Sequence, residues 1–91
     1  MTPDEALMLA KVAASQDRLV YTQHAKQERM PARGLLPDDV RRAVMTAARA
    51  RPDPPSDTKY RFEGGVDVDG DAVVAVVGVF VPDGVRVITV F

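Results

Sequence analysis

The chain has no cysteine and no tryptophan, a single histidine, and few aromatic side chains, which make up 5% of its 91 residues. Without cysteine there can be no disulfide bond, no thiolate zinc site and no thiol nucleophile, so any chemistry must come from other side chains. The longest apolar run, residues 72–81, is too short for a membrane-spanning helix. Residues 1–5 are not the basic start, followed by an apolar stretch, that is typical of a signal peptide. We therefore expect a cytoplasmic protein with no membrane anchor.

The composition is that of a folded protein of one domain, residues 1–91. Apolar residues make up 46% and charged residues 27% of a 9.9 kDa chain, close to the average for globular proteins. A chain of this size holds one small core and has room for one site.

The charges are unevenly distributed although the net charge is only −1. Residues 18–51 contain eight basic side chains against three acidic ones, whereas residues 52–91 contain three basic against seven acidic. The basic middle third is compatible with a surface for an anionic partner such as RNA, although arginines on solvated helix faces are also common.

Helices are expected in the first half of the chain. Thr2, Pro3 and Glu5 form a capping pattern that predicts a helix over residues 3–15. A short extended segment over residues 18–22 should follow, and then a second helix over residues 23–33, which Pro31 should kink or shorten.

A third helix should begin at Pro37, because apolar side chains then recur at helical spacing: Val40, Ala43, Val44, Ala47 and Ala48. Residues 51–57 contain three prolines in five positions and predict a loop.

The second half of the chain predicts strands over residues 58–63, 72–81 and 85–91, joined by turns at Asp69-Gly70 and at residues 82–84. The nearly unbroken apolar run of residues 72–81 is typical of a central strand. The predicted fold is therefore α+β, with two or three N-terminal helices packed on a C-terminal antiparallel sheet of three to four strands.

The most informative polar side chains lie on the predicted second helix. His24 is the only side chain that can take and give protons near neutral pH, although a lone surface histidine is more often without a role. Arg29 and Arg33 are four residues apart and should project from one helix face. They could bind a phosphate or pair with Asp38, Asp39 or Glu28. On a regular helix, however, Arg29 would lie roughly 140° around from His24.

Two further segments carry polar patterns. Asp67, Asp69 and Asp71 alternate as at the start of a calcium-binding loop, but Gly78 stands where the loop needs its last carboxylate, so a tight acidic turn is expected. Over residues 58–63, basic side chains should face one side and aromatic ones the other. On the last strand, Thr89 would share a face with Val87 and Phe91. We expect no metal site and no cofactor.

Four blocks of this sequence, taken in order, resemble the small bacterial proteins grouped as domain of unknown function 4258. The blocks are His24-Ala25-x-x-x-Arg29-Met30-x-x-Arg33-Gly34-Leu35, Asp39-Val40-x-x-Ala43, Lys59-Tyr60-Arg61-Phe62-x-Gly64-x-x-Asp67-x-Asp69-Gly70-Asp71, and Val87-Ile88-Thr89-Val90-Phe91. The resemblance covers about residues 19–91 and leaves the N-terminal helix, within residues 1–17, outside it.

This family looks like a relative of the RelE-type and BrnT-type ribonuclease toxins, and the resemblance implies a RelE-like fold and metal-independent RNA cleavage. His24, Arg29, Arg33 and Thr89 fall on the family's motif positions, and Arg61 lies in its strand motif. In the resulting hypothesis His24 is the acid or base, the arginines hold the phosphate, and Thr89 is an auxiliary donor. The expected RNA contacts are Lys26, Lys59 and Tyr60.

The candidate partners are RNA, a cognate antitoxin protein and a second copy of the chain. The alternative hypothesis is a non-catalytic binding or protein-interaction module, a degenerate toxin-like domain that could dimerise. It would be favoured if Arg29 and Arg33 contacted Asp38 and Asp39 and no cleft lay beside His24.

Overall fold

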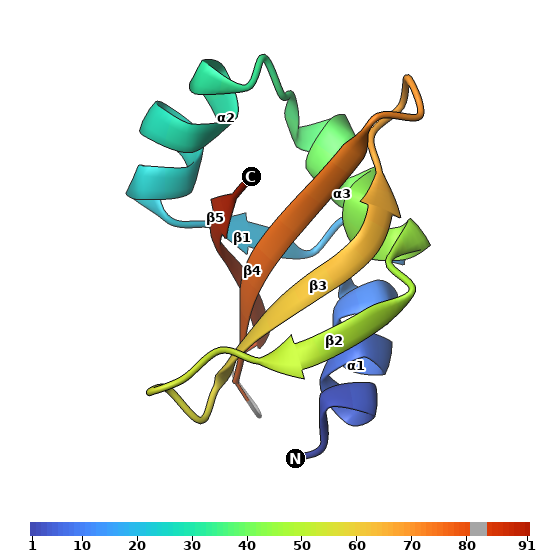
Figure 1. Ribbon diagram of the computed structural model, residues 1–91, viewed down its shortest axis with the longest axis vertical. Coiled ribbons are helices and arrows are strands. Elements are labelled where there is room, and N and C mark those ends of the chain that lie inside the picture. Colours follow the sequence, from blue (N-terminus) through green and yellow to red (C-terminus); the bar gives the residue numbers. More distant parts are fainter. Residues whose placement is uncertain (81–83) are drawn as a thin grey trace.

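A five-stranded sheet with two helices on one of its faces makes up most of the molecule (Figure 1). The computed structural model describes residues 1–80 and 84–91. The elements are α1 (Pro3–Ser15), β1 (Leu19–Tyr21), the π-helix η1 (Ala25–Arg29), α2 (Met30–Ala32), α3 (Pro37–Thr46), β2 (Arg49–Pro52), β3 (Lys59–Val66), β4 (Ala72–Phe80) and β5 (Gly84–Val90). The predicted α+β class, with helices first and strands last, is confirmed. Among the described residues, no helix is long and apolar enough to cross a membrane.

The strands lie in the order β1-β5-β4-β3-β2, so the apolar strand β4 occupies the centre of the sheet as predicted. Three of the four neighbouring pairs are antiparallel, whereas β1 runs parallel to β5. The sheet is therefore mixed and has five strands rather than three to four. The prediction that β4 extends to Val81, and the turn predicted around Pro82, lie in part outside the described residues.

The additional strand, β2, occupies residues predicted as the end of the third helix and the loop after it. The helix α3 ends at Thr46, and Ala47 takes a ψ angle of 135°. Ala48 donates its N–H to the carbonyl of Glu63 at 2.8 Å, so the chain joins β3 at once. β2 is an edge strand, where Pro52, which lacks an N–H, can be accommodated.

The core lies between the inner face of the sheet and the helices α1 and α3. The predicted capping box of α1 is present, with Glu5 N–H donating to the Thr2 hydroxyl at 3.1 Å and Thr2 N–H donating to the Glu5 carboxylate at 2.9 Å. The core side chains of both helices are mainly alanine and valine, which lets them approach the sheet closely. A Cβ at Gly65 would clash with the carbonyl oxygen of Ala43, so α3 lies directly against β3.

No helix among the described residues covers the other face of the sheet: in Figure 1, α1 and α3 lie behind β2, β3 and β4, and α2 lies beside the end of β5. We call this the outer face. Its side chains are Val20 on β1, Arg49 and Arg51 on β2, Lys59, Arg61 and Glu63 on β3, Val74, Val76, Gly78 and Phe80 on β4, and Arg86, Ile88, Thr89 and Phe91 on and after β5. Val76 is 5% exposed yet is not part of the main core cluster, which agrees with its place on this face.

Candidate functional site

The helix that carries His24 is attached to the sheet through Thr22. The Thr22 N–H donates to the carbonyl of Val87 at 2.9 Å, and its hydroxyl donates to the carbonyl of Ile88 at 2.9 Å. The same hydroxyl accepts the N–H of Ala25 at 3.1 Å, as an N-cap does. One threonine therefore ends β1, begins the next helix and holds that helix beside β5.

The helix then departs from α geometry, which decides how its polar side chains are grouped. The segment Ala25–Arg29 is a π-helix, and Met30 donates its N–H to the carbonyl of Ala25, five residues earlier. Pro31 favours this wider turn, since its nitrogen has no hydrogen and its ring would crowd the carbonyl of Gln27 in an α-helix. A kink or shortening was predicted at Pro31; the structure instead has a π-turn before it, and the helix continues to Ala32.

This turn brings His24 and Arg29 to the same side, because i→i+5 bonding stacks residues that are five apart. His24 Nε2 lies 3.4 Å from the hydroxyl oxygen of Thr89, and Arg29 Nε donates to the carbonyl of Val90 at 3.2 Å. The two side chains thus reach consecutive residues of β5. The 140° separation expected for a regular helix does not apply.

His24 is also held from its other side. Its Nδ1 lies 2.7 Å from a carboxylate oxygen of Glu28, one helical turn away. If the neutral imidazole donates its Nδ1 hydrogen to Glu28, the lone pair of Nε2 points toward Thr89. The His24 side chain is 53% exposed, so the imidazole is in part open to solvent.

A β-bulge in β5 turns Thr89 and Phe91 toward the outer face. Val77 pairs with Val87 while the preceding Val76 pairs with Thr89, so Ile88 is an additional residue in β5. Val87 is fully buried in the core, whereas Thr89 is partly exposed and contacts His24. The prediction that Thr89 and Val87 share a face was wrong, because the bulge shifts the alternation by one residue.

The ring of Phe91 contacts two arginines, one from η1 and one from β3. The guanidinium carbon of Arg29 lies 5.4 Å from the centre of the Phe91 ring, and that of Arg61 lies 5.3 Å from it. Both distances are within the range of cation–π attraction. His24, Thr89 and the two arginines therefore form one cluster at the end of β5.

Arg33 does not join this cluster through a described contact. Its Nη2 donates to the carbonyl of Ala72, the first residue of β4, at 3.4 Å. Asp39 instead accepts the N–H groups of Leu36 and Val68, at 2.8 and 3.2 Å. Among the described residues, the ion pairs include none between Arg29 or Arg33 and an aspartate.

The three expected RNA contacts have different surroundings. Tyr60 is 4% exposed, belongs to the core, and donates its hydroxyl to the carbonyl of Met1 at 3.3 Å. The expectation that Tyr60 contacts RNA was therefore wrong, because strand alternation turns it and Phe62 inward. Lys59 lies on the outer face and Lys26 is exposed on η1.

The outer face is strongly basic. In the part of the chain that the structure describes, five basic side chains share it with one carboxylate, Glu63, which contacts Arg49 at 2.9 Å and Arg51 at 2.8 Å. The hydrogen bond from Arg49, together with the charges of Arg51 and Arg61, lowers the pKa of Glu63 below its ordinary value. The face combines basic side chains of residues 18–51 with basic side chains of the later strands. The acidic Asp67 lies elsewhere, in the predicted turn, where it accepts the N–H groups of Asp69 and Asp71.

Searches with this chain found no matching family model, no matching curated protein and no matching solved structure. Hypotheses about function therefore depend on the arrangement of the residues themselves.

Sequence reasoning missed three residues of the site. Glu28 could have been found, since its spacing of four residues from His24 places the two side chains side by side on a helix. Thr22 has the form of an N-cap, but its bond to Ile88 depends on the fold. Phe91 could not have been assigned, because its position follows from the bulge.

Proposed function

We propose that this chain is a metal-independent ribonuclease of the toxin–antitoxin kind, in which His24 is the acid or base and arginines bind the phosphate. The observation that supports it best is the position of the His24 imidazole, with Glu28 at Nδ1, Thr89 at Nε2 and Arg29 alongside. A carboxylate on one ring nitrogen orients the ring and stabilises the imidazolium that forms when the other nitrogen takes a proton.

In the proposed reaction, the 2′-oxygen of a ribose attacks the adjacent phosphorus. A P–O2′ bond forms and the P–O5′ bond breaks, which leaves a 2′,3′-cyclic phosphate and a free 5′-hydroxyl. His24 Nε2 either accepts the proton of the 2′-hydroxyl or delivers a proton to the leaving 5′-oxygen. Water reaches this half-exposed site and exchanges the second proton.

The arginines would stabilise the charge that builds on the phosphate oxygens. A guanidinium has five N–H donors, so Arg29 keeps its terminal nitrogens for a ligand while Nε is bound to Val90. Arg61 approaches from β3, and Phe91 holds both head groups against one ring. Such fixed donors stabilise a transition state without further reorganisation. Arg33, on the adjoining helix, would bind a neighbouring phosphate, and the Thr89 hydroxyl would be an auxiliary donor.

The experiment is cleavage of a mixed-sequence RNA by the purified protein in EDTA, scored for 2′,3′-cyclic phosphate ends. His24→Gln should lower the rate by about 10²–10⁴ with the fold intact. Arg29→Lys should also impair cleavage because lysine lacks the two-pronged guanidinium. Arg42→Lys, at an exposed position of α3, is the matched control and should leave the rate unchanged. Cleavage that His24→Gln leaves unchanged would exclude His24 from the mechanism.

The second candidate is a non-catalytic module that binds a partner protein, such as an antitoxin or a second copy of the chain. A shallow apolar groove of about 570 Å³ between α1 and α3 favours it. Met8, Val12 and Met45 line this groove and are 68%, 43% and 39% exposed. The groove is formed by residues other than those around His24. A wild-type protein that forms a stable complex through the groove and cuts no RNA would favour this candidate.

A further inference from the structure

We propose that Phe80, Arg86 and Val20 form a second nucleotide-binding subsite, which takes one base of a single-stranded RNA whose backbone is held at His24. This inference rests on the proposed function for the identity of its ligand. It concerns a different part of the outer face, at the opposite end of β5 from Thr89.

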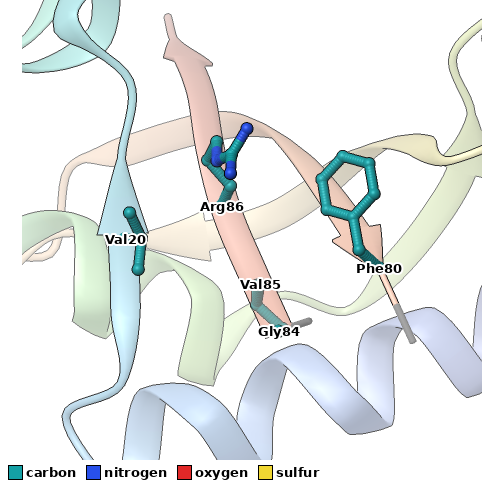
Figure 2. A pocket seen from close by; sticks show the side chains of 5 residues that line it. All are labelled: Val20, Phe80, Gly84, Val85 and Arg86. Atoms are coloured by element: carbon teal, nitrogen blue, oxygen red, sulfur yellow. The ribbon is translucent and has the colours of Figure 1, made fainter. Parts of the chain in front are cut away.

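The side chains of the subsite surround a small hollow. Figure 2 shows Arg86 on β5 between Phe80 on β4 and Val20 on β1. The guanidinium carbon of Arg86 lies 5.5 Å from the centre of the Phe80 ring. The hollow has a volume of about 130 Å³, and Val20 at its rim is 56% exposed.

Gly78 allows the Phe80 ring to lie on the sheet. A Cβ at position 78 would come within 2.7 Å of the ring, so any larger residue there would displace it. The ring therefore lies close over Gly78, with the guanidinium of Arg86 near it. This geometry presents a planar surface, of the kind on which nucleic-acid bases stack.

The subsite shares one feature with the cluster around Phe91. In each, a phenylalanine of the outer face lies beside an arginine from another element or strand. Phe91 pairs with Val74, and Phe80 is six residues further along β4, so the two phenylalanines are about 20 Å apart along the sheet. A dinucleotide bound at one ring would be too short to reach the other, so a longer strand is required to use both.

The charges favour RNA over a protein as the occupant. Among residues 1–80 and 84–91, the outer face presents five basic side chains and Glu63 as its one acid, and Glu63 is already engaged by three arginines. Planar apolar side chains interleaved with cations are typical of surfaces that bind single strands, where bases stack and phosphates are neutralised. In a duplex the bases are already stacked on each other, so this surface would select an unpaired strand.

The test uses a fluorescent 2′-O-methyl octanucleotide, which cannot be cut because it lacks the attacking hydroxyl. Binding is measured by anisotropy at low salt. Phe80→Leu keeps an apolar side chain of similar size but removes the ring, and it should weaken binding about fivefold to a hundredfold. Arg86→Ala should also weaken binding, whereas Arg42→Ala, which removes the same charge from α3, should not. Thermal melting checks that each variant is folded.

Equal binding by wild type and folded Phe80→Leu would overturn the subsite, and so would a wild type that binds no oligonucleotide. If the wild type is instead a dimer that Phe80→Leu dissociates, the surface is an interface between copies and the proposal fails. Cleavage of ordinary RNA is measured separately. Binding that depends on Phe80 without any cleavage would refute the proposed ribonuclease and leave the subsite standing.

Discussion

Replacing Thr22 with valine should loosen the site while it preserves the shape of the side chain. The substitution removes one hydroxyl that donates to the carbonyl of Ile88 and accepts the N–H of the fully buried Ala25. Removing an N-cap costs about 0.5–2 kcal/mol, and a net hydrogen bond contributes about 0.5–1.5 kcal/mol. We therefore expect the free energy of unfolding to fall by about 1–3 kcal/mol, which for a domain of this size lowers Tm by about 4–20 °C.

The matched control is Thr2→Val, which removes the N-cap of α1 on the other side of the molecule. Both variants should lose stability in urea denaturation, but only Thr22→Val should affect His24. Because the chain has one histidine, its imidazole nitrogens give a single set of NMR signals. These signals should move toward those of a free histidine in Thr22→Val, and RNA cleavage well below Tm should fall.

The reasoning would be refuted by a Thr22→Val protein that melts with the wild type. It would also be refuted if the variant were destabilised but kept wild-type imidazole signals, because Thr22 would then not position His24.

Three other predictions concern the sheet and its charges. Val77→Asp should abolish cooperative melting, because Val77 is fully buried in the core, whereas Val76→Asp, opposite an arginine on the outer face, should still fold. Arg29→Ala combined with Arg33→Ala should make the plot of log binding constant against log salt concentration less steep, by about one for each phosphate that is no longer neutralised. An unchanged slope in salt titrations would contradict this. Glu63 has a pKa below its ordinary value, so its ion pairs stabilise the fold above about pH 5, and the difference in stability from Glu63→Gln should shrink below about pH 4.

Local patterns were sufficient to predict most of the elements. The capping residues of α1 and the apolar run of β4 depend on neighbours in sequence, and the alternation of Tyr60 and Phe62 with basic residues correctly predicted one buried and one open face of β3. Strand β2 was missed because it is short, ends in Pro52 and exists only through pairing with β3.

The arrangement of the candidate site could not be predicted, because it depends on two irregularities. Helical spacing separates His24 from Arg29, and strand alternation groups Thr89 with Val87. The π-turn brings His24 and Arg29 to the same side, and the bulge turns Thr89 away from the face of Val87. Neither irregularity has a reliable pattern in a single sequence. Pro31 indicated where the helix would deviate but not that the deviation would widen the turn.

The bulge at Ile88 also makes the candidate site sensitive to a change in chain length. Deletion of this one residue would restore regular alternation, so that either Thr89 and Phe91 turn toward the core or the residues before them turn outward. Insertion or deletion of a single codon at this position would therefore decide whether Thr89 and Phe91 reach His24 and the two arginines, which come from other elements. Alignments that allow a gap at this position would distinguish chains without the bulge from those that retain the site.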